Sequence, residues 1–351
     1  MKFDLSEDQQ LLRSSTIDFL ATESPITASR QISESGGEGF SRTTWKKLAE
    51  LGYLGLVISE KAGGQGMGPI ELAIVCEELG KVCFPGPYLD VVLAAMVLEA
   101  SGKHRQVIKD IIAGNSIVVI ASADRVWPTD RPDAAFKNGR VTGTKYFVPF
   151  ASSADRLLVA TPQGLVLAEG PFQAEPMETL DEAARFDRVL FDGPAEPVGH
   201  NDLLSLAVDW MEIGAAADAL GICHKALEAS VFYSKQRQTF GKPIGAYQVL
   251  QHRMADMLVR TESSRAAVYR AAWCVARGTP EADLAAAAAK AYAVESACRI
   301  TRDTVQIHGG NGFTWEYDIH RYLKRAITLE QHHGRTDEVL ERVLSSFESV
   351  G

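Results

Sequence analysis

The spacing of apolar residues changes twice along the 351-residue chain. They recur at helical intervals up to about residue 114 and again from residue 201, whereas the stretch between carries short β-branched runs separated by turn residues. This pattern predicts an α+β multidomain fold. We expect a helical N-terminal domain, a central small β-barrel or sandwich and a C-terminal four-helix bundle, at residues 1–115, 116–198 and 199–351.

Cap residues and helical periodicity indicate where individual helices begin and end. Ser6, which precedes two acidic residues, suits an N-cap, and Gly52 suits the end of a short helix. The C-terminal part carries four long helical patterns, and their apolar stripes predict the core of a bundle. These patterns cover roughly residues 203–235, the stretch from about residue 245, residues 281–309 and residues 336–349.

Two turn signals mark β-hairpins in the central stretch. Asn138 and Gly139 separate two strand-like segments, and this dipeptide is a strong signal for a two-residue hairpin turn. Pro162, Gln163 and Gly164 separate a second pair of such segments. Short strands at this spacing, without helical patterns between them, favour a small sandwich or barrel.

Composition excludes several classes of protein. The net charge of −9 argues against nucleic acid as a partner, and no run of about 18 apolar residues could span a membrane. The acidic N-terminus lacks the apolar segment of a signal peptide, so we expect a cytoplasmic protein. No pattern indicates a metal site. The five cysteines lack metal-ligand spacing and are expected to be buried and reduced: Cys76, Cys83, Cys223, Cys274 and Cys298.

Two polar, glycine-containing segments interrupt the helical patterns near the C-terminus. In "RQTFGKPIGAYQ", the guanidinium of Arg237 could hold a phosphate in bidentate fashion, with hydrogen-bonding help from Thr239 and Gln248. In "QIHGGNGF", Gly309 and Gly310 could bring backbone amides close to a diphosphate because they carry no Cβ. The residues alone fit equally well a salt-bridged arginine and two turns that end helices.

Longer stretches around both segments resemble one family. "RQTFGKPIGAYQVLQHRMADM" and "AVESACRITRDTVQIHGGNGF" resemble C-terminal motifs of the acyl-CoA dehydrogenases, and "LGYLGLVISEKAGGQGMGPIELAIVCEELGK" resembles their N-terminal domain. The resemblance covers nearly the whole chain. It implies a flavoprotein that uses FAD to oxidise an acyl-CoA between its α and β carbons, with electron-transfer flavoprotein as the electron acceptor.

The family resemblance also assigns cofactor-binding positions. In such enzymes the two C-terminal segments reach across a subunit interface to the FAD of the neighbouring chain. The implied cofactor-binding residues here are Arg237, Gln238, Thr239, Phe240, Gln248, Gln306, Gly309 and Gly310.

The chain departs from the family where the flavin ring is usually held. The family's T-E-P-x-x-G-S-D segment corresponds to "SADRVWPTDRP", residues 122–132, which lacks the Gly-Ser turn. Its W-x-T-N segment corresponds to "YFVPFASSADRLLV", which contains no Trp and no Thr-Asn pair. The resemblance therefore predicts that the half of the site around the flavin ring is missing in this chain.

The family's catalytic carboxylate is missing as well. His333 stands where the base commonly lies, in "RAITLEQHHGRTDEV". Glu212 lies one residue from a second position used by some members, and a one-residue shift turns a helical side chain by about 100°. Glu330 is a weaker candidate. We expect no catalytic residue in this chain, with Glu212 and His333 as the alternatives.

These losses are selective, because the positions that would serve a neighbour's FAD remain. This arrangement resembles the non-catalytic subunit of actinobacterial heteromeric acyl-CoA dehydrogenases, in which two unlike homologous chains form α2β2 assemblies that act on steroid side-chain thioesters. The expected partner is a homologous flavin-binding catalytic subunit. Two alternatives are a self-sufficient homomer with a relocated base and a flavin-free scaffold or acyl-CoA-binding protein.

Overall fold

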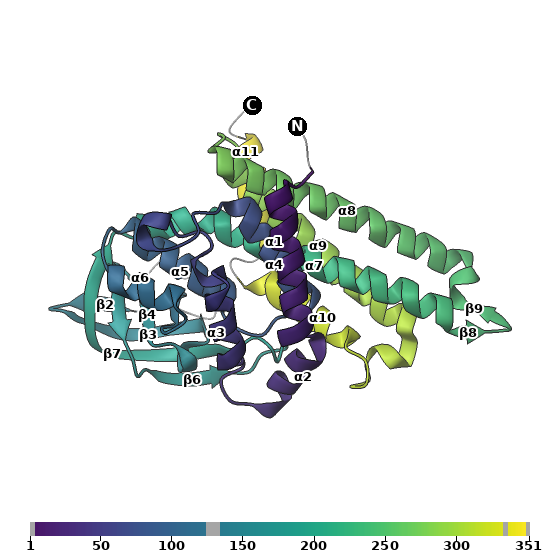
Figure 1. Cartoon of the computed structure of the whole chain (residues 1–351), viewed down its shortest axis with the longest axis horizontal. Coiled ribbons are helices and arrows are strands. Elements are labelled where there is room, and N and C mark those ends of the chain that lie inside the picture. Colours follow the sequence, from purple (N-terminus) through teal and green to yellow (C-terminus); the bar gives the residue numbers. More distant parts are fainter. Residues whose placement is uncertain (1–3, 124–133, 333–335, 349–351) are drawn as a thin grey trace. The chain divides into compact units, whose positions relative to one another are not determined.

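The computed structural model describes residues 4–123, 134–332 and 336–348 (Figure 1). The chain forms two compact units that alternate along the sequence. Gln31–Gly68 and Pro85–Val208 form the first, called the sheet unit here. Met1–Arg30, Pro69–Phe84 and Asp209–Gly351 form the second, called the bundle unit. Three consecutive domains with boundaries at residues 115 and 198 stay a prediction from the sequence pattern.

A seven-stranded sheet is the centre of the sheet unit, in the order β1-β4-β5-β7-β3-β2 with β6 also paired to β7. Among the strands that the structure describes, only β1 and β4 pair in parallel. The long strand β7 connects the two halves, because its first part pairs with β3 and β6 and its last part with β5. The strands are β1 (Val118–Ala121), β2 (Ala135–Lys137), β3 (Arg140–Pro149), β4 (Arg156–Thr161), β5 (Gly164–Glu169), β6 (Gln173–Met177) and β7 (Phe186–Gly199).

Both expected hairpins are confirmed. Asn138 and Gly139 join β2 to β3 with φ values of 52° and 74°, the left-handed conformations that a two-residue turn of this kind requires. Thr161 pairs with Gly164 across the β4–β5 turn. These turns set the register, so the alternating apolar residues of the strands face one core.

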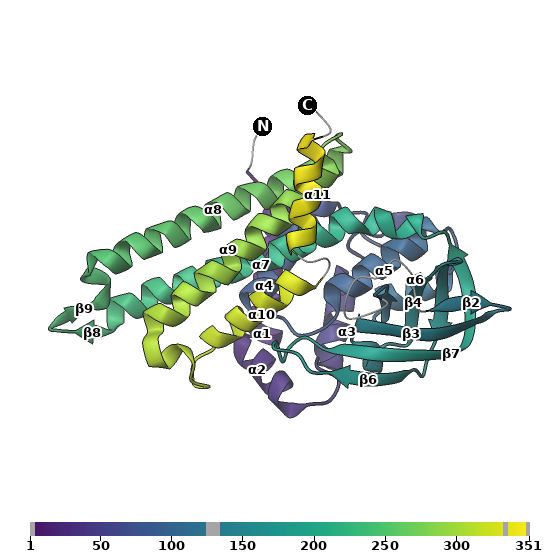
Figure 2. The same cartoon turned by 180° about the vertical axis from the view of Figure 1, so that it is seen from behind.

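Short helices cover the sheet in the same unit. Figure 2 shows α5 and α6 lying against the strands, and α5 contacts β1 directly. The helical segments that belong to this unit are α3 (Arg42–Glu50), η1 (Tyr53–Gly55), η2 (Glu60–Ala62), α5 (Tyr88–Ala100), α6 (Arg105–Ile112) and η3 (Ala151–Ser153). α2 (Ile26–Ser35) begins in the bundle unit and ends in the sheet unit.

The bundle unit is built around the alanine-rich helix α9, which packs against α8, α10 and α11. Small side chains on α9 let these neighbours approach closely. Figure 2 shows α11 crossing α9. The helices are α1 (Glu7–Glu23), α4 (Pro69–Lys81), α7 (Asp202–Gln236, with its first turns in the sheet unit), α8 (Gln248–Arg277), α9 (Ala282–His308), α10 (Ile319–Gln331) and α11 (Thr336–Glu348).

The structure confirms the four long C-terminal helices expected from the sequence and adds α10, which was not expected. Ser6 caps α1 through a capping box with Gln9. All five cysteines are buried and free, as expected. In the described part of the chain no helix is long and apolar enough to cross a membrane.

The crossing of α4 and α7 depends on glycine. A Cβ at Gly80 would lie 2.2 Å from the carbonyl oxygen of Asp218, and a Cβ at Gly221 would lie 2.0 Å from that of Glu77. Both distances are far below van der Waals contact. The two helices can therefore approach this closely only because both positions lack a side chain.

Candidate functional site

A tight hairpin connects α7 to α8. Arg237 follows the last residue of α7, and β8 (Gln238–Thr239) pairs with β9 (Lys242–Pro243) around Phe240 and Gly241, whose φ values are 51° and 80°. Positive φ at both central positions is the geometry of a type I′ turn. The short 3₁₀ turn η4 (Ile244–Ala246) then leads into α8, which begins at Gln248.

Local contacts hold this hairpin against the start of α8. The amide of Ile244 donates to the carbonyl oxygen of Arg237 at 2.8 Å. The hydroxyl of Tyr247 donates to the carbonyl oxygen of Thr239 at 3.2 Å, and the Lys242 ammonium lies 4.2 Å from the centre of the Tyr247 ring. The backbone around Arg237 and Thr239 is therefore fixed within the chain, while the side chains remain available to a ligand.

The second glycine segment forms the 3₁₀ turn η5 (Gly309–Gly312) at the end of α9. Gly309 has φ 59° and ψ −136°, a conformation that glycine adopts far more readily than other residues. A Cβ at Gly309 or Gly310 would meet nothing within 4 Å, whereas one at Gly312 would lie 2.7 Å from the carbonyl oxygen of Val305. Gly312 is thus needed for internal packing, and the first two glycines leave an open backbone surface.

Tyr233 brings the two segments together. Its ring stacks on that of His308 with centroids 4.2 Å apart, and its hydroxyl accepts a hydrogen bond of 3.2 Å from the Asn311 side chain. One turn earlier, Ser230 donates to Thr304 at 3.0 Å. These contacts hold the end of α7, which precedes Arg237, against the end of α9, which precedes Gly309.

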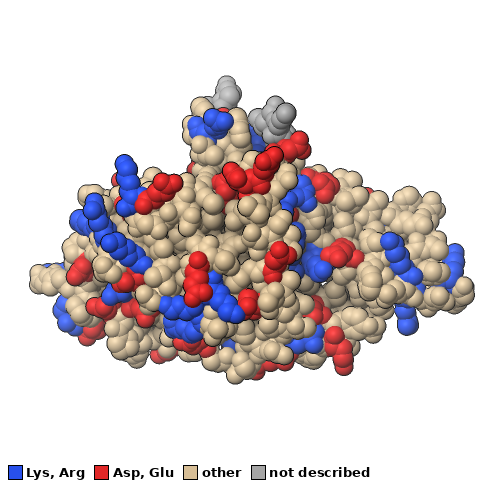
Figure 3. Space-filling view, viewed as in Figure 1, with Lys and Arg blue, Asp and Glu red and all other residues tan. Residues whose placement is uncertain are grey.

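The implied cofactor-binding side chains are exposed at this end of the bundle unit. Phe240 is 97% exposed, and Arg237, Gln238, Gln248 and Gln306 are exposed as well, with Thr239 half-buried. Arg237 forms no ion pair with any residue that the structure describes, which removes the interpretation of a salt-bridged arginine. Figure 3 shows basic side chains standing out over β8 and β9.

These groups suit the phosphate portion of a dinucleotide. An exposed guanidinium without an internal partner, an open glycine backbone and several amide side chains are donors of the kind that bind diphosphates. The stretch that corresponds to the family's flavin-ring segment is different. There, Phe150 is buried against Phe40 with ring centroids 6.0 Å apart, and no Thr-Asn pair is present. Most of the other departing segment, residues 124–133, lies outside the described residues.

Glu212 is buried in the bundle unit and ion-paired. It is 1% exposed, and its Oε1 atom lies 2.5 Å from a guanidinium nitrogen of Arg342 on α11. Burial raises the pKa of Glu212 above its usual range, and Arg342 and Lys290 oppose that rise. Burial also lowers the pKa of Lys290 to about 8, against the opposing charge of Glu212. Glu212 thus belongs to an ion cluster between α7, α9 and α11.

The remaining base candidates have less support. His333 lies outside the described residues. Glu330 is half-buried on α10, a regular helix that ends at Gln331, just before residues 332–335, where the resemblance implied a catalytic loop. No group of three or more His, Cys, Asp or Glu residues that could hold a metal ion occurs among the described residues.

Sequence reasoning missed the residues that position the two segments. Tyr233 lies four residues before Arg237, and His308 lies two residues after Gln306. Both were treated as ordinary helix residues. Tyr233 stands one helical turn before Arg237, but nothing in the sequence pairs it with His308, because their contact joins positions 75 residues apart.

Comparisons with known proteins agree with these features. Residues 6–109 match the family model described as "Acyl-CoA dehydrogenase, N-terminal domain", and residues 203–346 match "Acyl-CoA dehydrogenase, C-terminal domain". "Acyl-CoA dehydrogenase IpdE2" of Mycolicibacterium smegmatis is 33% identical over 340 residues, which cover 97% of this chain and 98% of that protein.

Solved structures show the same likeness. A chain of the "ChsE4-ChsE5 complex from Mycobacterium tuberculosis" has 25% identity and a TM-score of 0.90, with 99% of both chains covered. A chain of the "Tcur3481-Tcur3483 steroid ACAD G363A variant" has 26% identity and a TM-score of 0.88, with 98% of this chain and 99% of that chain covered. This chain therefore belongs to the acyl-CoA dehydrogenases, a family of FAD-dependent oxidoreductases that act on CH–CH bonds.

Proposed function

We propose that this chain is one subunit of a heteromeric acyl-CoA dehydrogenase and completes the FAD site of a homologous catalytic partner. One observation carries the proposal. Arg237 and the open backbone of Gly309 and Gly310 are held at the same end of the bundle unit by the Tyr233–His308 stack, and Arg237 has no ion-pair partner in the described part of its own chain.

In this proposal the chain contributes binding and orientation. Arg237 holds a phosphate oxygen of the dinucleotide, Thr239 adds a hydroxyl, and Gln248 and Gln306 add amide hydrogen bonds. Gln238 and Phe240 lie on the same hairpin and form its exposed wall. Bound FAD would supply the acceptor for the hydride from the β carbon of the acyl-CoA, with electron-transfer flavoprotein as the expected acceptor of its electrons.

The base is assigned to the partner subunit. A base must reach the α carbon with a free carboxylate or imidazole. The Glu212 carboxylate is instead 1% exposed and paired with Arg342 inside the bundle unit. The segments that hold the flavin ring in the family also depart from its pattern here, which is consistent with a partner that supplies both functions.

The proposed substrate is an acyl-CoA thioester, with steroid side-chain thioesters as the narrower class. Support for the narrower class comes from a similar solved structure described as a "steroid ACAD". Support for a partner of unlike sequence comes from the similar chain in a two-protein complex.

Co-expression tests the proposal. The chain should purify without stoichiometric flavin when it is produced alone, and as a yellow, dye-reducing complex when it is produced with a homologue that carries the missing segments. Full flavin content and activity from this chain alone would contradict the proposal. A flavin-free spectrum with every homologous partner would instead favour the scaffold alternative.

Arg237→Ala, with Arg277→Ala as its control, tests the site itself. Both arginines are exposed, and Arg277 lies at the other end of α8, about 45 Å away for a helix of 30 residues. Arg237→Ala should raise the Kd of the complex for FAD at least about tenfold, because a charged hydrogen bond to phosphate is lost. Arg277→Ala should leave the Kd unchanged, and equal FAD affinity in both variants would contradict the assignment.

A further inference from the structure

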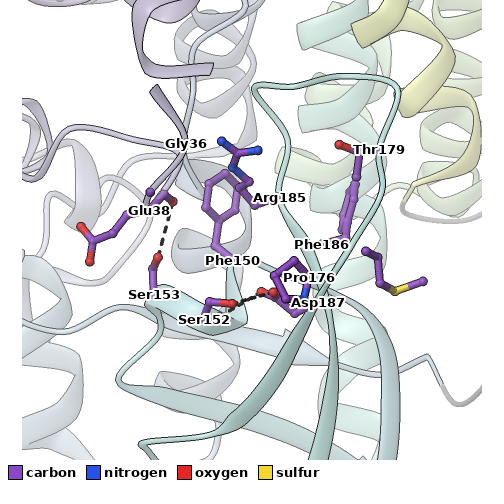
Figure 4. A pocket seen from close by; sticks show the side chains of 12 residues that line it. Gly36, Glu38, Phe150, Ser152, Ser153, Pro176, Thr179, Arg185, Phe186 and Asp187 are labelled. Atoms are coloured by element: carbon purple, nitrogen blue, oxygen red, sulfur yellow. Dashed lines mark hydrogen bonds between the residues drawn. The ribbon is translucent and has the colours of Figure 1, made fainter. Parts of the chain in front are cut away.

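A cavity of about 210 Å³ lies in the sheet unit, apart from the residues proposed to bind the dinucleotide phosphates. Phe150, Ser152 and Ser153 in its wall belong to the stretch that corresponds to the family's W-x-T-N segment. Its walls come from the loop between α2 and α3, from η3, from the end of β6 and from the start of β7 (Figure 4). Gly36, Phe150 and Arg185 lie around it, with Glu38 and Asp187 as its two carboxylates. Such a volume is below the usual range for drug-sized ligands, so it suits a small group.

Both carboxylates already have partners. Glu38 forms two hydrogen bonds with Arg42, at 2.8 and 2.9 Å, and this bonding lowers the pKa of Glu38 below its usual range. Asp187 accepts hydrogen bonds from the amide and the hydroxyl of Ser152, at 2.9 and 2.6 Å. Glu38 is therefore balanced by a cation of its own, and both oxygens of Asp187 already accept hydrogen bonds.

Arg185 is the charged group that lacks such a partner. Its Nε atom is buried without a hydrogen bond, and the guanidinium forms no ion pair within the part of the chain that the structure describes. Leaving a buried charged donor unpaired costs free energy, so a ligand that accepts this hydrogen bond would be stabilised. Arg185 is also held in place. Gly39 packs so closely against its side chain that a Cβ at Gly39 would lie 2.5 Å from the Cγ of Arg185. The carbonyl oxygen of Arg185 accepts a hydrogen bond from the Phe150 amide at 3.0 Å.

The rest of the cavity leaves room beside the guanidinium. Figure 4 shows the guanidinium of Arg185 on the same side of the Phe150 ring as Gly36. Gly36 and Gly37 have φ values of 71° and 72°, and a Cβ at either position would meet nothing within 4 Å. The loop therefore leaves space where side chains would otherwise project.

We infer that this cavity binds a small oxyanion, a carboxylate or a phosphoryl group, through the guanidinium of Arg185. The planar guanidinium offers parallel N–H donors that match the two oxygens of either group. Arg42 balances the charge of Glu38, and Ser152 occupies both oxygens of Asp187, so within the described part of the chain neither carboxylate is bonded to the guanidinium of Arg185. The inference does not depend on the proposed function, since Arg185 is not among the residues proposed to bind FAD and the departing stretch around Phe150 is not assigned any cofactor contact in this chain.

Calorimetric titration of the purified full chain with sodium phosphate and with sodium acetate, at constant ionic strength in chloride, tests the inference. Saturable binding of at least one anion is expected, and the preferred anion distinguishes a phosphoryl from a carboxylate ligand. Arg185→Met keeps an unbranched stem but has no guanidinium, and it should weaken binding at least about tenfold. Absence of saturable binding by both anions would overturn the inference.

Two further variants show whether anion binding depends specifically on the guanidinium of Arg185. Arg188→Met removes a neighbouring guanidinium that is bonded to Glu175 on the sheet surface, and it should leave the affinity unchanged. Arg185→Lys keeps a positive charge and an unbranched stem, so it serves if the methionine variant does not fold. It should bind several-fold more weakly than the wild type, because an ammonium cannot form the bidentate pair. Wild-type affinity in Arg185→Lys would contradict the role of the guanidinium.

Discussion

Tyr233 and His308 stack with ring centroids 4.2 Å apart and planes inclined by 26°. The imidazole also hydrogen-bonds through Nδ1 to the carbonyl oxygen of Thr304 at 2.8 Å, so the ring has a fixed orientation on α9. Burial lowers the pKa of His308, and the bond to Thr304 opposes that shift. A largely neutral ring therefore connects the helix that precedes Arg237 to the glycine turn.

Two substitutions of Tyr233 distinguish its contribution to the stability of the chain from its contribution to FAD binding. Tyr233→Phe keeps the stack and loses the hydrogen bond from Asn311, which should cost about 0.5–1.5 kcal/mol of unfolding free energy. Tyr233→Leu also loses the stack, with a further cost of about 0.5–1.5 kcal/mol. Urea denaturation of the single chain measures these losses.

The same two variants bear on the FAD site of the complex. Tyr233→Leu should raise the Kd for FAD more than Tyr233→Phe does, because the glycine turn loses its orientation relative to Arg237. Equal FAD affinity in the wild type and Tyr233→Leu would show that the stack contributes only to stability.

A second prediction concerns Gly221 at the crossing of α4 and α7. Alanine in a helix interior normally gains about 1 kcal/mol over glycine. Here the new Cβ would lie 2.0 Å from the carbonyl oxygen of Glu77, so the helices must separate, and overpacking of this kind costs about 1–3 kcal/mol. Because steric strain exceeds the gain in propensity, Gly221→Ala should lower the free energy of unfolding, as measured in urea.

Gly310→Ala is the matched control for stability, since its Cβ would meet nothing within 4 Å. The stability of the single chain should be unchanged by this substitution. In the complex, however, the added methyl group would stand on the surface proposed to face FAD and should weaken flavin binding. A lower free energy of unfolding in Gly310→Ala would contradict this account of the two glycines. So would an unchanged free energy of unfolding in Gly221→Ala.

Sequence periodicity predicted the helices and hairpins well, because their signals are local. α10 is the exception, although Ile319, Tyr322, Ala326 and Leu329 recur at helical spacing and are buried. This stretch was not among the four expected helices, and the catalytic loop that the resemblance implied lies after it, at residues 332–335. The amphipathic pattern of these four residues was therefore a local signal sufficient to predict α10.

Long-range pairs in the site could not be predicted in the same way. The contact between Glu212 and Arg342 joins residues 130 positions apart, and no period in either helix indicates which charges meet. The motif residues themselves were located by resemblance, while the positioning contact of Tyr233 with His308 became visible only in the fold.

His224 gives a prediction about pH. Burial lowers its pKa to about 4, and the guanidinium of Arg265, which contacts Nε2, lowers it further, whereas Glu77 opposes the shift. The unfolded chain binds this proton near pH 6.5, so between pH 6.5 and about 4 the unfolded state holds more protons than the folded state. The unfolding free energy should therefore fall as the pH falls through this window, by on the order of 2–3 kcal/mol from His224 alone.

The variant His224→Gln checks this assignment. Glutamine can still accept a hydrogen bond from Arg265 but has no proton to gain. Urea denaturation at several pH values between 7 and 4 should show a weaker pH dependence in His224→Gln than in the wild type. Parallel stability profiles for the two proteins would refute the link to His224.

Substitution of Glu212 tests whether the bundle unit contains a catalytic base of its own. Its carboxylate is ion-paired with Arg342, and its Oε2 atom has no hydrogen-bond partner among the described residues. In the proposed complex Glu212→Gln should change kcat less than twofold, since the partner supplies the base. A homomer that used Glu212 would instead lose about 10²–10⁴-fold in kcat with this substitution.

Arg342→Met provides the structural counterpart to Glu212→Gln. It leaves a buried carboxylate with Lys290 as its remaining cation, and it should lower the unfolding free energy by about 1–3 kcal/mol because Arg342 itself is 45% exposed. The loss should be smaller in the double variant with Glu212→Gln, since a neutral amide no longer needs the guanidinium. Strictly additive losses of unfolding free energy in the single and double variants would show that the two side chains do not act as a pair. A large loss of kcat in Glu212→Gln, with unchanged stability, would identify Glu212 as the catalytic base.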